Sequence, residues 1–199
     1  MWLLLNSLGV LAFASSGAFA AVEADFDLFG VIVVALSASL GGGVIRDTVV
    51  GLPADYLWQQ SSYIWLAIGM ATLVYFLPEP MQRVYAMGGI IVDAIALGAY
   101  AVEGALLAEK AHLPMVAILF AAVMTGIGGG VIRDLLVGRR PLVFQKELYA
   151  VWAGLGGLVV ATHVLYAPLA ALFVTVLRLI SYRFGWSLPR GRHFVKSLN

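Results

Sequence analysis

Two segments of this chain repeat an unusual combination of residue types, three consecutive glycines followed by an arginine and an aspartate. Residues 41–47 and residues 128–134 both have the sequence GGGVIRD. Each glycine in a helix interior costs about 1 kcal/mol relative to alanine, so three in a row favour a kink or a break. In an apolar setting, the backbone groups that a break exposes must face protein or a water-filled cavity. The glycines therefore predict a polar interior, unless they serve close helix packing, for which Gly126 and Gly130 also have the spacing.

The charged residues of the two motifs are harder to explain by packing. An ionised side chain costs roughly 2.5–3.5 kcal/mol at the centre of a bilayer and less towards the ends of a helix. An arginine can extend to the headgroups, whereas an aspartate is too short. Neighbouring residues on a helix point in different directions, so Arg46 is not expected to pair with Asp47, nor Arg133 with Asp134. Each of these side chains is expected to find a partner on another helix and to line a functional interior.

A further acidic residue, Asp93, lies near the middle of an apolar run, between GGIIV and AIALG. A carboxylate at this depth should be buried, paired with an arginine or placed on a water pathway. Its counterpart in the internal repeat described below is Asn6, which is also polar. The two residues predict one shared cavity, with a structural hydrogen bond between helices as the alternative. Glu103 lies nearer the end of its run and is expected at the membrane interface.

Other reactive side chains give no sign of catalysis. The chain has no cysteine and three scattered histidines, so a thiol nucleophile is excluded and neither a metal site nor a cofactor is expected. No phosphate-binding glycine loop or G-x-S-x-G elbow is present. The net charge of +1 leaves no basic surplus for nucleic acid. We therefore expect neither an enzyme nor a nucleic-acid-binding protein.

The composition places these residues in a membrane. Hydrophobic residues make up 62% of the 199 residues and charged residues 12%, too few charges to cover a soluble domain. Crossing the hydrocarbon takes about 20 apolar residues, and most of the apolar runs approach that length. The sequence predicts an all-α integral membrane protein with seven transmembrane helices, at about residues 2–22, 28–50, 63–77, 84–108, 114–137, 148–166 and 169–182.

An internal repeat relates the first three runs to the next three. A shift of 87 residues places Gly41 on Gly128 and Trp65 on Trp152 without a gap. The N-terminal run matches the fourth run, so we expect a retained helix rather than a cleaved leader. Three helices per copy make the second copy enter the membrane from the opposite side. The prediction is one transmembrane domain over residues 1–184, divided into a first repeat (about 1–80), an inverted second repeat (about 84–166) and a seventh helix (about 168–184), followed by a basic cytoplasmic tail over residues 185–199.

Lysine and arginine are distributed unevenly between the two predicted sides. Arg46 and Lys110 lie on the side of the N-terminus, and the other side carries many more basic residues. The positive-inside rule then places the C-terminus in the cytoplasm and the N-terminus outside, in the inner (plasma) membrane. The basic residues counted on the cytoplasmic side are Arg83, Arg139, Arg140, Lys146, Arg178, Arg183, Arg190, Arg192 and Lys196.

The paired GGGxxRD motif, in the second and fifth of seven helices, resembles the prokaryotic trimeric intracellular cation (TRIC) channels. The resemblance covers about residues 1–183, and DAIALGAYAVEG, at residues 93–104, also looks like the fourth helix of that family. It implies a homotrimer in membrane lipid, with a pore in each subunit that conducts monovalent cations passively, mainly potassium and also sodium. It further implies helices two and five kinked at the glycines, and a polar lining that includes the charged residues of both motifs. These residues are Gly41, Gly42, Gly43, Gly128, Gly129 and Gly130 for the kinks and Arg46, Asp47, Arg133 and Asp134 for the lining.

The residues by themselves leave alternatives open. Carbonyl groups at the end of a first half-helix favour cations, whereas N–H groups at the start of a second favour anions. The sign of the ion thus comes from the resemblance alone. A secondary transporter of a small solute could use the same inverted repeats and broken helices. A purely structural membrane protein is the third possibility.

Overall fold

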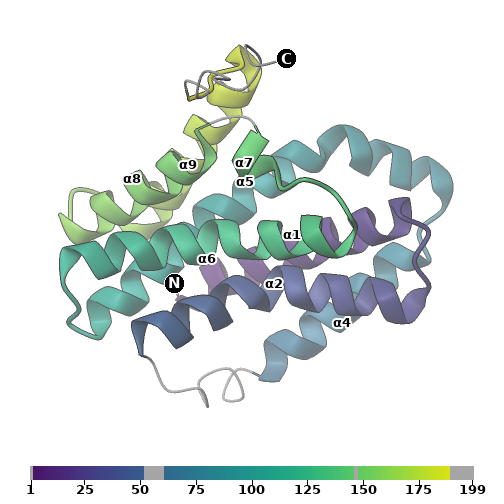
Figure 1. The fold of residues 1–199 in the computed structure, drawn as a ribbon, viewed down its shortest axis with the longest axis horizontal. Coiled ribbons are helices and arrows are strands. Elements are labelled where there is room, and N and C mark those ends of the chain that lie inside the picture. The colour runs from purple at the N-terminus through teal and green to yellow at the C-terminus, as the bar shows by residue number, and fades with distance from the viewer. Residues whose placement is uncertain (1, 52–60, 146–147, 189–199) are drawn as a thin grey trace, which may run out of the picture.

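The computed structural model describes residues 2–51, 61–145 and 148–188, and these form helices joined by short connections (Figure 1). Long helices account for most of the described chain, and α7 is a single short turn. Each of the seven predicted apolar runs coincides with a helix. The bounds are α1 (Trp2–Glu23), α2 (Leu28–Val50), α4 (Ser61–Tyr75), α5 (Glu79–Lys110), α6 (Met115–Leu136), α7 (Leu142–Gln145), α8 (Tyr149–Ala161) and α9 (Ala167–Phe184).

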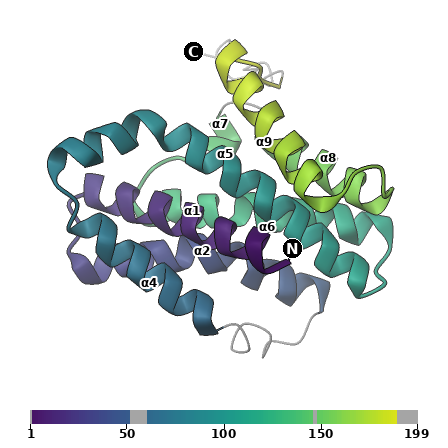
Figure 2. The same cartoon turned by 180° about the vertical axis from the view of Figure 1, so that it is seen from behind.

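Four helices form the centre of the molecule. α2 packs against α6, α5 packs against both α6 and α1, and α1 packs against α2. α4 covers α1 and α2, and α8 covers α5 and α6 in the same way. The packing therefore follows the predicted repeat, with α1, α2 and α4 corresponding to α5, α6 and α8. α9 lies outside this correspondence, against α5 and α8 (Figure 2).

The two central motif helices run in opposite directions. Arg139, just after α6, pairs with Glu23 at the end of α1, with 3.0 Å between Nη2 and Oε2. Because α2 begins a few residues after Glu23, the start of α2 lies beside the end of α6, as Figure 1 also shows. At the other end of the molecule His163, after α8, lies 3.1 Å from Glu109, at the end of α5. This antiparallel arrangement is what an inverted repeat requires.

Local signals in the sequence account for the helix ends. Asp27 caps α2, because its side chain accepts a hydrogen bond of 2.8 Å from the N–H of Gly30. α2 ends at Gly51 and α9 at Gly185, both with positive φ, a conformation that glycine adopts without strain.

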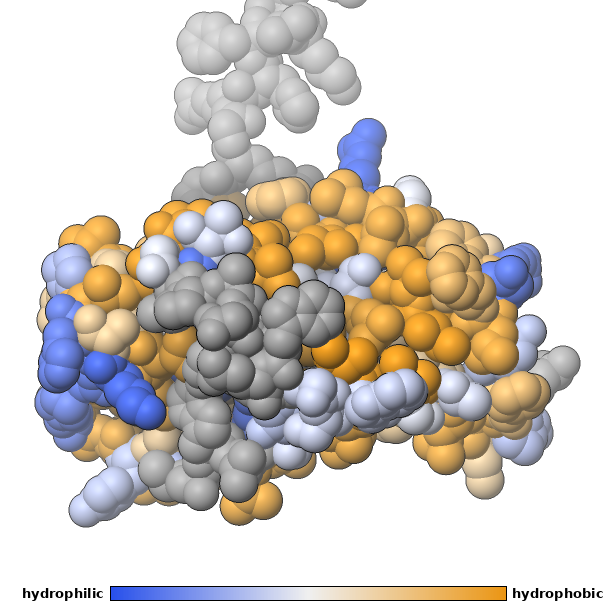
Figure 3. Space-filling view, turned by 90° about the horizontal axis from the view of Figure 1, so that it is seen from below, coloured by the Kyte–Doolittle hydropathy of each residue, from blue (hydrophilic) through white to orange (hydrophobic). Residues whose placement is uncertain are grey.

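The surface fits a membrane. The face seen in Figure 3 has broad hydrophobic areas, and the most hydrophilic residues lie mainly towards its left and right ends. Large apolar side chains such as Phe29, Trp65 and Val116 are exposed. Of the helices described, α1, α2, α5, α6 and α9 are long and apolar enough to span a membrane. α4 has 15 residues and α8 has 13, below the length of about 20 for a full crossing, so the number of seven crossings stays a prediction.

The glycine triplets do not interrupt their helices. α2 is helical from Leu28 to Val50 and α6 from Met115 to Leu136, through both triplets. The predicted break is therefore not confirmed. The physical reason is that other helices pack against the triplets closely enough to offset the low helix propensity of glycine. A bend that keeps the backbone hydrogen bonds stays a prediction.

Candidate functional site

α2 and α6 approach each other closely at the glycine triplets. A Cβ added to Gly128 would lie 2.9 Å from Gly42 Cα, and one added to Gly42 would lie 2.7 Å from the carbonyl oxygen of Thr125. A Cβ on Gly129 would overlap the carbonyl group of Ala38. Backbone therefore lies directly against backbone, which only glycine permits. The alternative of close packing thus describes these glycines better than helix breakage.

The side chain of each motif's arginine lies against the third glycine of the same motif. Gly43 and Arg46 are three residues apart, as are Gly130 and Arg133, so each pair shares one face of its helix. A Cβ on Gly43 would lie 3.5 Å from Arg46 Nη2, and one on Gly130 would lie 4.0 Å from Arg133 Nη2. Each guanidinium thus folds back along its own helix instead of extending away from it.

This course of the side chain brings each arginine to the aspartate that follows it. Arg46 Nε donates to Asp47 Oδ1 at 2.8 Å, and Arg133 Nε donates to Asp134 Oδ1 at 2.8 Å. The expectation that neighbouring arginine and aspartate would not pair is wrong. A long, flexible arginine reaches round the helix to a residue whose Cβ points elsewhere. Both arginines also reach other helices, as expected, and both are buried.

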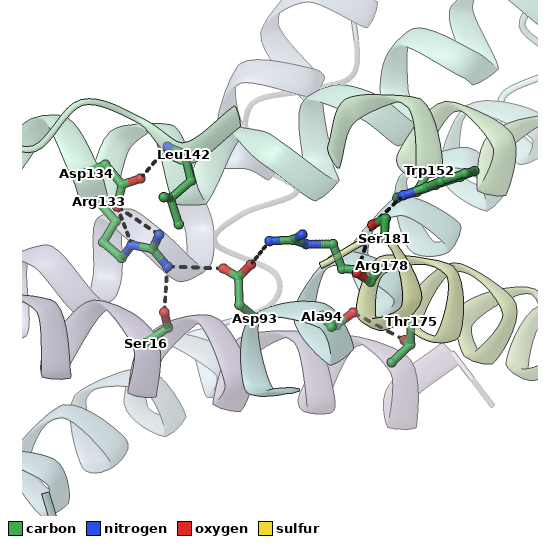
Figure 4. Close-up of polar contacts among 10 residues, drawn as sticks. All are labelled: Ser16, Asp93, Ala94, Arg133, Asp134, Leu142, Trp152, Thr175, Arg178 and Ser181. Carbon is green, nitrogen blue, oxygen red and sulfur yellow. Dashed lines mark hydrogen bonds and ion pairs between the residues drawn. The ribbon is translucent and has the colours of Figure 1, made fainter. Parts of the chain in front are cut away.

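Arg133 is the centre of a cluster that joins α1, α5, α6 and α9. Its Nη1 donates to Ser16 Oγ at 2.6 Å and to Asp93 Oδ1 at 3.3 Å (Figure 4). Asp134 Oδ2 in turn accepts a hydrogen bond of 3.1 Å from the N–H of Leu142, the first residue of α7. The connection between α6 and α8 is thereby held over the cluster. We call Ser16, Asp93, Arg133, Asp134 and Arg178 the Arg133 cluster.

Asp93 lies between two arginines. Its Oδ1 contacts Arg133, and its Oδ2 lies 3.8 Å from Nη2 of Arg178 on α9 (Figure 4). Arg178 is 1% exposed, and its guanidinium lies 4.6 Å from the centroid of the Tyr149 ring, within cation–π distance. Asp93 is thus buried and paired, as the sequence predicted, although the second partner was missed.

Arg178 was grouped with the basic residues of the cytoplasmic side, and its burial within the helix bundle corrects its expected surroundings. One signal could have revealed this position. Arg178 lies alone within the apolar stretch LFVTVLRLI, well before the end of α9. A single charge inside an apolar helix favours a partner in the interior.

A second cluster surrounds Arg46 and corresponds to the first by the repeat. Arg46 Nη1 donates to Thr125 Oγ1 at 3.3 Å and lies 3.9 Å from Oε1 of Glu103 on α5. By the shift of 87 residues, Glu103 is the counterpart of Ser16 and Asn6 that of Asp93. We call Arg46, Asp47, Glu103 and Thr125 the Arg46 cluster. Arg46 belongs to the first repeat, and the acid that it contacts on α5, Glu103, belongs to the second.

The interfacial position expected for Glu103 is wrong. Glu103 is 5% exposed, and α5 continues for seven more residues to Lys110. At a rise of 1.5 Å per residue this places Glu103 about 10 Å inside the helix end. Burial, together with the charge of Arg46 nearby, makes it a candidate site residue that the sequence prediction missed.

Each cluster lines a cavity. The first cavity, of about 50 Å³, is lined by Asn6, Arg46, Asp47 and Glu103 together with Tyr63 and Tyr100. The second, of about 460 Å³, lies at the end of α1, α6 and α9, and all five residues of the Arg133 cluster line it together with Glu23, Arg139 and Arg140. Asn6 and Asp93 thus line different cavities, and the single shared cavity expected for them is wrong. The reason is that the repeats are inverted, so corresponding residues face opposite ends of the bundle.

The described lining residues give the two cavities opposite charges. One arginine and two acids line the first, which gives a formal charge of −1. Arg133, Arg139, Arg140 and Arg178 face the three acids Glu23, Asp93 and Asp134 in the second, which gives +1. Among the described residues, no residue lines both cavities.

Comparison with known proteins agrees with this geometry. A family model described as "Glycine transporter" matches residues 3–79 and 90–177, so the gap falls between the two repeats. The UPF0126 membrane protein YvgT of Bacillus subtilis is 44% identical over 192 residues, which cover 94% of this chain and 95% of the relative.

Solved structures match over nearly the whole length. One, described as the structural basis for conductance through TRIC cation channels, is 31% identical with a TM-score of 0.82, and the match covers 95% of this chain and 96% of the other. A prokaryotic TRIC channel crystallised in 0.5 M KCl is 32% identical, also with a TM-score of 0.82, over 94% and 98% of the two chains. This chain belongs to the prokaryotic TRIC family. The recognition made from the doubled motif is confirmed, and the TRIC chain described here is a multi-pass, all-helical membrane protein.

Proposed function

We propose that this chain is a passive, potassium-permeable channel for monovalent cations, with a pore inside each subunit of a homotrimer. The observation that carries the proposal is the likeness, along almost the entire chain, to structures of TRIC cation channels. The relatives are membrane proteins and the structural neighbours are channels, which favours a non-enzymatic role.

The charges inside the chain support a route through the single subunit. Buried ionisable residues within membrane helices are costly and mark ion or substrate pathways. Here they occupy two separate cavities on either side of the glycine crossing between α2 and α6. Potassium or sodium ions would enter one cavity, pass the crossing when α2 and α6 shift, and leave through the other.

The pore residues that we propose are those of both motifs together with the polar positions of the two cavities. Gly41–Gly43 and Gly128–Gly130 would allow α2 and α6 to move, because adjoining backbones can slide without side chains between them. Arg46 and Arg133 would hold the acidic residues in place rather than repel cations. Asp47, Asp93, Asp134 and Asn6 complete the proposed lining.

A recording from purified protein tests the channel. In planar bilayers under a tenfold KCl gradient, a cation channel has a reversal potential close to the potassium equilibrium potential. We expect single-channel steps with a potassium-selective reversal potential. A reversal potential near that of chloride, or no current from protein that elutes as a trimer, would contradict the proposal.

One observation favours a second candidate, a secondary transporter for glycine. The matching family model is described as a glycine transporter, and an inverted repeat with central cavities suits alternating access. Liposomes loaded with unlabelled glycine would accumulate labelled glycine by counterflow if the chain is a transporter. We expect no counterflow, because a passive cation pore has no mechanism for exchanging zwitterions.

A further inference from the structure

The first cavity contains a hydroxyl group that its protein surroundings leave unsatisfied. Tyr63 on α4 is 8% exposed and lines this cavity, and its hydroxyl oxygen has no hydrogen-bond partner among the described residues. A buried hydroxyl is nearly always hydrogen-bonded, so one that faces a cavity indicates a bound polar species. The cavity volume of about 50 Å³ suits one small ion with a few water molecules.

A carboxylate, Glu103, lines the same cavity, and its ion pair with Arg46 is a long one. The ion-pair contact of Glu103 is with Arg46, at 3.9 Å between Oε1 and Nη1, which is too long for a hydrogen bond. Arg46 itself is held by Asp47 at 2.8 Å and by Thr125 at 3.3 Å. Of these three contacts of Arg46, the one with Asp47 is the shortest and the one with Glu103 is the longest.

The second cavity also contains a carboxylate oxygen without a hydrogen bond, Asp93 Oδ2, but there α9 places a second arginine beside the acid. Asp93 is held between Arg133 and Arg178, and Arg178 belongs to the helix outside the repeat. The first half has no counterpart of α9 among the described elements, and the ion pair described for Glu103 is with Arg46 alone. The internal symmetry is broken in charge as well as in helix number, and of these two cavities the first has the net negative lining.

We propose that the first cavity is a binding site for one compact monovalent cation, with the Glu103 carboxylate and the Tyr63 hydroxyl oxygen as its protein ligands. Hard oxygen donors and a net charge of −1 suit an alkali ion with part of its water shell, or a primary ammonium group. This inference rests on the proposed function and adds to it a site at which the permeating ion pauses. Bound there, the ion would satisfy the Tyr63 hydroxyl and neutralise Glu103.

Binding can be measured apart from conduction. The purified full chain is melted in detergent while KCl replaces choline chloride at constant ionic strength, because a ligand that binds only the folded protein raises its melting temperature in a saturable manner. We expect a saturable rise for the wild type and for the control Glu109→Gln, whose acid lies at the end of α5 beside His163. Glu103→Gln should abolish the rise. Tyr63→Phe should increase the apparent dissociation constant about tenfold, the equivalent of about 1.4 kcal/mol.

Further arms keep the proposal open to refutation. Methylammonium and glycine replace KCl in parallel titrations and distinguish an alkali ion from an ammonium group as the ligand. If Glu103→Gln does not fold, Glu103→Asp and Tyr63→Phe decide. The proposed site is overturned if the saturable rise in melting temperature persists unchanged in the Glu103 and Tyr63 variants. It is also overturned if neither potassium nor methylammonium gives a saturable rise.

The same variants separate this inference from the channel itself. Potassium currents without Glu103-dependent binding would contradict the proposed binding site but not the proposed channel. Binding that depends on Glu103, in a protein that passes no current, would contradict the proposed channel but not the proposed binding site.

Discussion

Replacing Asp93 with asparagine removes the one carboxylate that the structure places between two buried arginines. Asp93 is 6% exposed, with Arg133 at 3.3 Å and Arg178 at 3.8 Å. Removing one partner of a buried ion pair costs about 3–5 kcal/mol, because the remaining charge stays buried without compensation. Asp93→Asn should therefore lower the free energy of unfolding by about 3 kcal/mol or more, roughly a hundredfold in the folding equilibrium.

The chain offers a matched control at the surface. Glu23 and Arg139 approach more closely, to 3.0 Å, but both side chains are about half exposed (50% and 48%). Solvent screening limits such a pair to about 0–1 kcal/mol. Glu23→Gln should therefore change the free energy of unfolding little, although its ion pair is shorter than that of Asp93. Burial, and not the distance between the charges, decides how much stability an ion pair contributes.

Reversible unfolding of both variants in mixed detergent, beside reversal potentials under a KCl gradient, makes the comparison. If Asp93→Asn lowers the free energy of unfolding no more than Glu23→Gln does, the argument from burial is refuted. A large loss with an unaltered reversal potential would make Asp93 a structural residue and exclude it from the ion path. A weakened cation preference in protein that remains folded would place it on the path.

Two further predictions concern the glycine crossing and the topology. Gly128→Ala with Gly129→Ala should destabilise the chain by about 1–3 kcal/mol or more, since each added methyl group meets backbone of α2, and should reduce potassium flux through assembled trimers. Gly69→Ala, where an added Cβ meets nothing within 4 Å, should be neutral or stabilising by up to about 1 kcal/mol; equal melting curves for the two variants would count against the close crossing. An impermeant thiol reagent outside the cell should label a cysteine at position 2, and only a permeant reagent should label one at position 196. Labelling of both from one side would exclude an odd number of crossings.

Much of the architecture could be predicted because it depends on local composition and periodicity. Each of the seven apolar runs coincides with a helix, although seven full crossings stay a prediction. The shift that aligns the two GGGVIRD motifs also identified which helices would pack alike. The effect of the triplets was not predictable in the same way, because helix propensity describes an isolated helix and here neighbouring backbone holds the triplets in helical form.

The sequence alone determined that this protein is a helical membrane protein with an inverted repeat, since apolar length and residue spacing are properties of the chain itself. It also predicted that Asp93 would be buried, paired with an arginine or placed on a water pathway, because a short acid in mid-helix cannot reach the headgroups. Only the tertiary structure decided the partners. Arg178 meets Asp93 because α9 packs on α5, and Glu103 faces Arg46 because α5 from one repeat lies against α2 and α6. Such contacts join residues that lie far apart in the chain. Which of them come close enough to interact depends on how the helices pack, and the order of residues does not show that packing.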